Sequence, residues 1–282
     1  MGNCCMPQGG GQGEDQRKRP YVQMKQQETW AKTGIVGLRE QGIKELPAAL
    51  VDCGASLRVI DASHNRITSL PSFLATLGGL QRLVLAGNAL SGCGLPPGAC
   101  TGLASLKILV LDDNQLSDLP PDLGSLTKLE KLSVAGNRLR ELPGSVGQLE
   151  TLQFLILARN LLEQLPDQLS GCARLEELDA QGNELAVLPP SLGDLKKLKT
   201  LNVDNNKVLS VPQEILFGCV SLQTLSLHGC PIKPDDLQET PGFKEFDERR
   251  KSKYNKVIAG GALLGNKGLD EGVDREVSPP RR

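Results

Sequence analysis

Aromatic side chains are scarce in this chain of 282 residues, which has one tryptophan, two tyrosines and five phenylalanines. Because 39% of the residues are nonetheless hydrophobic, the core must be aliphatic, and the length fits one or two domains. The sequence lacks an apolar run of the ~18 residues that a transmembrane helix needs, and its start lacks the apolar segment of a secretory signal. The net charge of −1 argues against a nucleic-acid partner held through phosphate contacts.

A periodic pattern of leucines fills most of the chain. The segment Leu80-x-x-Leu83-x-Leu85-x-x-Asn88-x-Leu90 shows the pattern in full. Related segments begin at Leu57, Leu106, Leu129, Leu152, Leu175, Leu198 and Leu222, and a degenerate copy with Val36, Leu38 and Ile43 precedes them. Successive asparagines are 23 residues apart, except for 26 between Asn88 and Asn114. Such self-similarity is the signature of a leucine-rich repeat.

Each part of the repeat has a physical role. The alternation at Leu83 and Leu85 predicts a short strand with one buried face, and stacked copies align these strands in a parallel sheet. A Leu-Pro pair such as Leu142-Pro143 recurs later in each repeat and ends regular pairing. The predicted fold class is α/β: a right-handed leucine-rich-repeat solenoid with a concave parallel β-sheet and a convex side of short 3₁₀ and helical segments.

The chain divides into four predicted parts. They are a flexible leader over residues 1–28, a solenoid of about eight repeats with a degenerate N-terminal cap over 29–240, a C-terminal capping helix over 241–258, and a disordered tail over 259–282. The ends need caps, because one repeat cannot bury its own leucines. The candidates are Trp30 and Ile35 at the front, and Leu237, Phe243, Phe246 and Tyr254 at the back.

The repeat resembles that of intracellular leucine-rich-repeat proteins with 23-residue repeats, including the plant Ras-group-related proteins and their animal scaffold relatives. The front segment, residues 30–38, and the back segment, residues 243–251, resemble the flanks of stand-alone plant and algal repeat proteins. The back segment is also similar to animal leucine-rich repeat-containing protein 57. The resemblance covers residues 1–275 and implies a small cytoplasmic repeat protein with an acylatable N-terminus and no enzymatic domain.

The concave face is the candidate binding surface, since exposed strand faces on a rigid scaffold commonly carry binding residues. We expect five apolar side chains there to face solvent: Val84, Ile108, Val110, Phe154 and Ile156. Charged candidates flank them: Arg82, Asp112, Asp113, Lys131, Arg159, Glu177 and Asp179. An apolar centre with charges around it is typical of a protein-binding patch. The alternative is that β-branched residues simply suit strands and cost little when exposed singly.

The first residues, Met1-Gly-Asn-Cys-Cys-Met6, look like an acylation signal. Gly2 is the candidate for myristate, and Cys4 and Cys5 are candidates for palmitate, the second anchor that stable membrane binding requires. The consensus has Ser or Thr where this chain has Met6, so an ordinary flexible leader is the alternative.

No pattern of catalytic or metal-binding residues emerges from the sequence. His64 and His228 are the only histidines and fall at opposite ends of the array, and no Cys-x-x-Cys pair is present. Cys53, Cys100, Cys172 and Cys219 take leucine positions of the repeat and are expected in the core. We therefore expect no enzyme activity, no metal, no cofactor, no small-molecule substrate and no nucleic acid partner.

The sequence thus favours a non-catalytic scaffold or adaptor that binds a cytoplasmic protein on its concave face and is tethered by its acylated N-terminus to a membrane surface, the plasma membrane or an endomembrane. Alternatives are a regulatory subunit of a signalling enzyme in a phosphatase or small-GTPase pathway, by analogy with relatives, and self-association through the concave patch.

Overall fold

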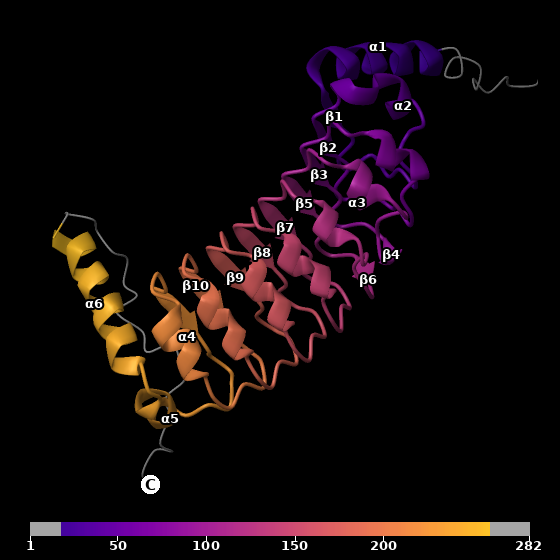
Figure 1. The fold of residues 1–282 in the computed structure, drawn as a ribbon. Coiled ribbons are helices and arrows are strands. Elements are labelled where there is room, and N and C mark those ends of the chain that lie inside the picture. The colour runs from indigo at the N-terminus through magenta and orange to yellow at the C-terminus, as the bar shows by residue number, and fades with distance from the viewer. Residues whose placement is uncertain (1–17, 260–282) are drawn as a thin grey trace, which may run out of the picture.

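The computed structural model describes the backbone of residues 18–259 and side chains within residues 26–252. In this part of the chain, nine short parallel strands stand side by side in chain order and form one sheet. The sheet lines the inner side of an arc, and short helices line the outer side (Figure 1). Its strands are β1 (Ile35–Gly37), β2 (Val59–Asp61), β3 (Arg82–Val84), β5 (Ile108–Val110), β7 (Lys131–Ser133), β8 (Phe154–Ile156), β9 (Glu177–Asp179), β10 (Thr200–Asn202) and β11 (Thr224–Ser226).

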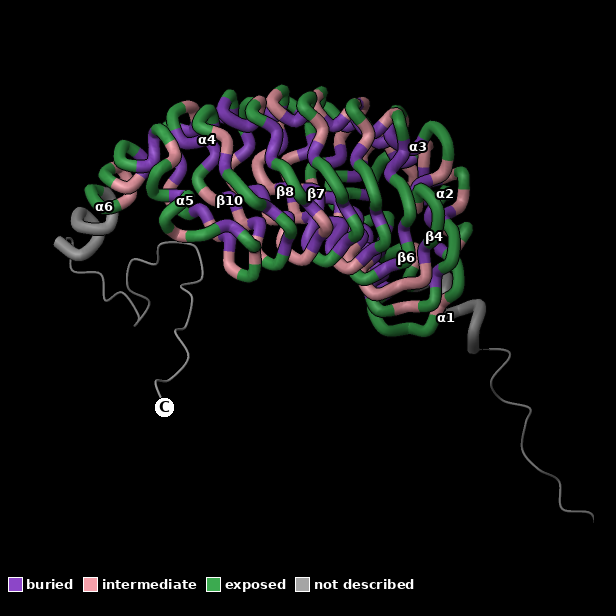
Figure 2. The backbone as a smooth tube through the Cα atoms, turned by 90° about the horizontal axis from the view of Figure 1, so that it is seen from below, coloured by how far each residue is buried: buried purple, intermediate pink, exposed green. Residues whose placement is uncertain are grey.

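The strands pair in register, so that equivalent residues of successive repeats lie next to one another. Leu109, for example, lies between Leu83 and Leu132. These middle residues are fully buried, whereas the first and third residues of most strands are partly exposed on the concave face. Figure 2 shows the result as buried stripes that alternate with exposed ones along the array. Burying one leucine side chain contributes about 2–3 kcal/mol, so the stacked leucines are the main source of stability.

The asparagine of each repeat ties consecutive repeats together. The Asn137 side-chain amide donates to the carbonyl oxygens of Leu111 at 3.0 Å and Val134 at 2.9 Å, and its oxygen accepts from the Leu116 N–H at 3.0 Å. The same pattern repeats from Asn65 to Asn206, and Asn137 itself is buried. The asparagine thus satisfies backbone groups that three-residue strands leave unpaired.

The convex side consists of short segments, as the Leu-Pro pairs predict. Prolines 71, 143, 166 and 189 each directly precede a 3₁₀ helix. These segments are α2 (Leu50–Cys53), η1 (Gly54–Ser56), η2 (Ser72–Thr76), α3 (Ala99–Gly102), η3 (Leu123–Ser125), η4 (Gly144–Gln148), η5 (Asp167–Gly171), η6 (Pro190–Asp194) and α4 (Gln213–Gly218). The longer spacing between Asn88 and Asn114 supplies a small additional sheet, in which β4 (Ser91–Gly92) pairs with β6 (Gln115–Leu116).

Helix α1 (Lys18–Thr33) lies across the N-terminal end of the array (Figure 1). It includes residues 18–28, which the sequence assigned to a flexible leader; the segment carries helix-favouring Lys, Gln and Glu, and its Pro20 falls in the first turn. Trp30 is buried, but Ile35 is 55% exposed, so the expectation that Ile35 covers the first repeat is wrong. Ile35 is the first residue of β1 and therefore lies on the concave face.

At the other end, α5 (Pro234–Glu239) leads into α6 (Phe243–Ala259), which packs against α4. Phe243 and Phe246 are buried, with ring centroids 6.1 Å apart, and the Arg249 guanidinium donates to the Leu216 carbonyl oxygen at 2.6 Å. The Tyr254 side chain and residues 260–282 of the predicted tail lie outside the described residues.

Candidate functional site

The candidate site is the concave face, where strand residues form two columns across the sheet. The first column runs through Val59, Arg82, Ile108, Lys131, Phe154, Glu177 and Thr200, and the second through Asp61, Val84, Val110, Ser133, Ile156, Asp179 and Asn202. Neighbouring strands in a sheet are about 4.8 Å apart, so adjacent members of a column cover part of each other. The candidates on the strands therefore lie on the predicted face, whereas Asp112, Asp113 and Arg159 lie beyond the strand ends.

The apolar candidates are less open to solvent than the sequence predicts. Ile108, Val110, Phe154 and Ile156 are half-buried, and Val84 is only 9% exposed. Val84 is flanked in its column by Asp61 and Val110, which lie directly beside it on β2 and β5. The expectation of a solvent-facing Val84 is thus wrong, because column neighbours on both sides cover it.

Strand β7 divides the apolar surface into two parts. Its Lys131 lies between Ile108 and Phe154, and its buried Ser133 lies between Val110 and Ile156. We call the part on β8 the Phe154 patch, defined by Phe154 and Ile156. The concave face therefore offers two half-buried apolar areas with a lysine between them.

Four charged side chains on the strands beside the Phe154 patch differ in sign from one side of the patch to the other. Arg82 and Lys131 lie on the N-terminal side of the Phe154 patch, and Glu177 and Asp179 lie on β9, directly beside it. Among the described residues, none of these four side chains forms an ion pair. A binding segment would therefore meet positive charge at one end of the Phe154 patch and negative charge at the other.

Asp112 has a structural role in addition to its place on the concave face. Its Oδ1 accepts hydrogen bonds from the Ser133 hydroxyl at 2.7 Å and the Ala135 N–H at 2.8 Å. Asp204, four repeats later, accepts equivalent bonds from the Ser226 hydroxyl and the His228 N–H, both at 2.7 Å. The sequence analysis missed Asp204, although an aspartate followed one repeat later by a strand serine was a usable signal.

Asp179 is a carboxylate on the concave face whose pKa is shifted by its surroundings. Burial raises its pKa, the hydrogen bond from the Gln181 N–H lowers it, and the negative charge of Asp204 raises it further. The net direction is upward, which means that the ionised form is disfavoured in the folded protein. An approaching cation would relieve this penalty.

The rim beyond the second column is formed by the residue that precedes the asparagine of each repeat, a position with a positive φ throughout the array. Asp113 and Arg159 have positive φ angles of 51° and 57° and form an exposed ion pair of 3.1 Å across the intervening repeat. Between them, a Cβ at Gly136 would come within 2.3 Å of the Asp113 Oδ1. Glycine at this position leaves room for the ion pair, and the exposed charges of Asp113 and Arg159 make the rim a candidate contact.

Four cysteines behave as core residues, as the sequence predicts. Cys53, Cys100, Cys172 and Cys219 are buried, and Cys93 is exposed. Burial raises the pKa of the Cys100 and Cys172 thiols to about 12 and that of Cys219 to about 11, so these thiols stay protonated and unreactive at neutral pH. Within the described residues, no group of three or more His, Cys, Asp or Glu side chains is placed to hold a metal ion.

The lipidation candidates Gly2, Cys4 and Cys5 lie outside the described residues. None of the helices in the described part of the chain is long and apolar enough to span a bilayer.

Comparison with known sequences identifies relatives along nearly the whole array. The family profile described as leucine rich repeat matches residues 55–116, 80–139 and 127–185, and that described as leucine rich repeats (2 copies) matches residues 173–215. Plant intracellular Ras-group-related LRR protein 7 of rice, Oryza sativa subsp. japonica, is 59% identical over 87% of this chain and 92% of its own length. Protein 8 of the same series in rice is 40% identical over 88% of this chain and 66% of its own length.

Solved structures show the same architecture. The plant peptide hormone receptor RGFR1 in complex with RGF2 is 31% identical, with a TM-score of 0.53 over 71% of this chain and 36% of the receptor chain. A TDR receptor is 25% identical, with a TM-score of 0.56 over 67% of this chain and 37% of the receptor chain. The chain thus spans about a third of each of these receptors.

Proposed function

The chain belongs to the leucine-rich-repeat family of plant intracellular Ras-group-related proteins, and from that premise we propose that it is a non-catalytic scaffold that holds an intracellular protein on its concave face. The observation that carries the proposal is the Phe154 patch. It places a half-buried aromatic and a β-branched residue between an unpaired lysine on β7 and unpaired carboxylates on β9. Aromatic anchors surrounded by polar groups supply most of the binding energy at protein interfaces.

The proposed contact residues lie in the two columns of the concave face and on the rim beyond the second column. The apolar contacts are Val84, Ile108, Val110, Phe154 and Ile156, and the polar contacts are Arg82, Asp112, Lys131, Arg159, Glu177 and Asp179. The unpaired side chains favour a partner segment with an acidic residue near Arg82 or Lys131 and a basic residue near Glu177 and Asp179. The receptor RGFR1, of the same fold, was solved in complex with RGF2, which supports binding of protein or peptide ligands by this architecture.

The test is affinity capture from a native lysate with quantitative mass spectrometry. The variant Val110→Asp, Phe154→Asp, Ile156→Asp is compared with wild type and with Val51→Asp, Val220→Asp, which changes two exposed valines off the concave face. Circular dichroism first establishes that both variants are folded. Loss of specific partners from the concave variant alone is the expected result, whereas an unchanged partner set refutes concave binding.

We further propose that Gly2 is myristoylated and that Cys4 and Cys5 are palmitoylated, which would tether the scaffold to a cytoplasmic membrane surface. The experiment is metabolic labelling with an alkynyl myristate and cell fractionation, for wild type, Gly2→Ala and Cys4→Ser, Cys5→Ser. Gly2→Ala should lose label and membrane association, and the cysteine variant should keep the myristate label but dissociate from membranes. Membrane association that survives both changes would exclude the tether.

A second candidate function is regulation of a signalling enzyme in a phosphatase or small-GTPase pathway. It is favoured by the name of the rice relatives, Ras-group-related, and by nothing in the geometry of the concave face. The same capture experiment decides between the two functions, since a phosphatase or GTPase lost from the concave variant supports the second.

A further inference from the structure

The two edges of the large sheet differ in charge. Because its strands are all parallel, the chain enters every strand at one edge and leaves it at the other. We call the first edge the entry face and define it by the four residues that precede each strand of this sheet after β1: residues 55–58, 78–81, 104–107, 127–130, 150–153, 173–176, 196–199 and 220–223. Seven basic and three acidic side chains lie on it: Arg58, Lys107, Lys128, Arg174, Lys196, Lys197 and Lys199, and Glu130, Glu150 and Glu176.

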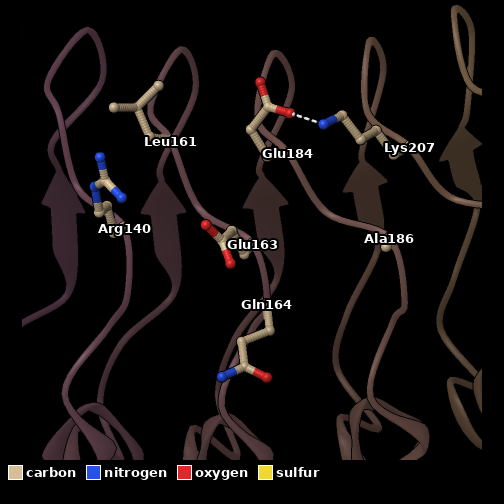
Figure 3. A pocket seen from close by; sticks show the side chains of 7 residues that line it. All are labelled: Arg140, Leu161, Glu163, Gln164, Glu184, Ala186 and Lys207. Atoms are coloured by element: carbon tan, nitrogen blue, oxygen red, sulfur yellow. Dashed lines mark ion pairs between the residues drawn. The ribbon is translucent and has the colours of Figure 1, made fainter.

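The opposite edge has no such excess of positive charge. The four residues that follow the asparagine of each repeat, from 66–69 to 207–210, carry four basic and four acidic side chains. Figure 3 shows part of this edge, a hollow of about 630 Å³ that is lined by Arg140 and Glu163 and by the ion pair between Glu184 and Lys207. Positive charge therefore accumulates at one edge of the sheet only.

Two of the three carboxylates on the entry face are already neutralised. Glu130 pairs with Lys107 at 2.9 Å, and Glu176 pairs with Lys199 at 2.5 Å, in each case across to the neighbouring repeat. Five basic side chains then remain against one carboxylate, Glu150. The positive charge of the entry face is thus free to meet a partner.

Three of the remaining cations form a row. Lys128, Arg174 and Lys197 occupy the same position of their repeats, are exposed, and form no ion pair with any described residue. In the other repeats this position carries serine, glycine or threonine, so no carboxylate interrupts the row.

Lys128 and Arg174 also line a hollow of about 150 Å³ in the middle of the entry face. They are two repeats apart, which corresponds to about 10 Å along the edge of the sheet. Thr151 and Gln153 of the intervening repeat line the space between them, and the Thr151 hydroxyl already donates to backbone carbonyl oxygens. The Gln153 side-chain amide has no partner among the described residues. Two free cations and a free amide donor around a small hollow suit a phosphate group.

The composition of the entry face distinguishes between phosphate-bearing partners. Protein interfaces have an apolar core, and single-stranded nucleic acids stack their bases on aromatic side chains. The entry face has no aromatic residue, and its one large exposed aliphatic side chain, Val220, lies at its C-terminal end. An anionic lipid surface attracts basic side chains through charge alone and presents phosphates over a wide area. Such an area matches cations that extend over six repeat spacings from Arg58 to Lys199, about 30 Å at the sheet edge.

We propose that the entry face contacts an anionic lipid surface, with a lipid phosphate in the hollow between Lys128 and Arg174. In this orientation the N-terminal ends of the strands point towards the lipid, and the concave face stays open to a partner from the side. The contact needs neither the acylation of Gly2, Cys4 and Cys5 nor a protein on the concave face. It would also fix the orientation of the array on a membrane to which the N-terminus is tethered.

The first test is sedimentation of the full chain, expressed without acyltransferases, with lipid vesicles. Wild type should sediment with vesicles of equal parts phosphatidylcholine and phosphatidylserine, and not with vesicles of phosphatidylcholine alone. Binding should weaken as salt is added, because salt screens exposed charges. The proposal is overturned by a wild type that does not bind the anionic vesicles, that binds both kinds equally, or that binds a single-stranded oligonucleotide instead.

The second test locates the contact. Lys128→Glu, Arg174→Glu should lower the affinity for the anionic vesicles at least about tenfold, since each basic residue near such a surface changes it about fivefold. Lys128→Gln, Arg174→Gln adds no negative charge and should bind with an affinity between those of wild type and the glutamate variant. Circular dichroism establishes that each variant is folded.

The matched control is Arg138→Glu, Arg140→Glu, which reverses two exposed cations at the opposite edge and changes the net charge by the same amount. It should bind the anionic vesicles like wild type. Equal losses in the two glutamate variants would mean that net charge, and not the entry face, governs binding, which overturns the proposal.

The lipid contact and the acyl tether can fail separately. Vesicle binding by the unacylated chain reports on the entry face alone, whereas metabolic labelling reports on Gly2 and the two cysteines. An unacylated chain that ignores anionic vesicles refutes the lipid contact and leaves the tether standing.

Discussion

At the scale of single residues, Asp179 lies on the concave face in surroundings that disfavour its ionised form. Asp179 is half-buried on β9, burial raises its pKa, and Asp204 adds to the effect. The folded state therefore holds the proton more tightly than the unfolded chain does, so ionisation of Asp179 lowers the free energy of unfolding as pH rises above the ordinary value of 3.8. A residue that reduces stability on a candidate binding face is consistent with a role in contact.

We predict that Asp179→Asn raises the thermal midpoint of unfolding at neutral pH. Asparagine removes the buried charge and can still accept the hydrogen bond from the Gln181 N–H. The gain should shrink as pH falls towards 3.8, because wild-type Asp179 is then protonated. Calorimetry across this range checks the prediction, with Asp118→Asn at an exposed position as control. A lower midpoint at neutral pH would show that the charge stabilises the fold.

The sequence placed the concave candidates correctly but not their surroundings. The two-residue alternation assigns Phe154 and Ile156 to one face, because successive strand residues point to opposite sides. It does not indicate that Val84 is covered or that Asp112 accepts two hydrogen bonds. Those features depend on which side chains the neighbouring repeats present, information that no single repeat contains.

At the scale of elements, the asparagine ladder connects one repeat to the next. Asn137→Ala would leave the Leu116 N–H and the Leu111 and Val134 carbonyl oxygens without this partner in a buried setting. We expect a loss of about 3 kcal/mol in the free energy of unfolding, measured by urea denaturation.

The control for the ladder is Arg138→Ala, the next residue along the chain, whose side chain is exposed and which should change stability by less than about 0.5 kcal/mol. If Asn137→Ala were no more destabilised than this control, the asparagine would not be the link between repeats.

The elements that the repeat dictates were predictable, and those outside it were less so. Strands and 3₁₀ turns follow from the spacing of Leu, Asn and Leu-Pro, which recurs many times. Helix α1 has no such periodic support, because its apolar residues are few, and its only clear anchor among the described side chains is the buried Trp30. A single anchoring residue does not define where a helix begins.

At the scale of the whole molecule, stability depends on how the array ends. Each repeat contacts only its neighbours, so the last one relies on α6. Phe246 is 1% exposed at this junction, and the Arg250 guanidinium lies 5.8 Å from its ring centre. We predict that Phe246→Ala lowers the free energy of unfolding by about 3–5 kcal/mol, because it leaves a cavity at this junction.

The matched comparison is Phe217→Ala, near the same end of the array. Phe217 is 48% exposed, so its removal should lower the free energy of unfolding far less. Denaturant unfolding measures both variants, and hydrogen exchange should show β10 and β11 opening first in Phe246→Ala. Equal losses for the two variants would mean that α6 does not stabilise the end of the array.

The most direct test of concave binding is site-specific photocrosslinking. A benzophenone amino acid replaces Phe154 on the concave face or, as the matched control, Phe217 on α4, and the protein is irradiated in native lysate. The account predicts covalent adducts with a specific protein from position 154 and none from position 217. Adducts from position 217 alone would contradict it and assign the binding surface to the convex side.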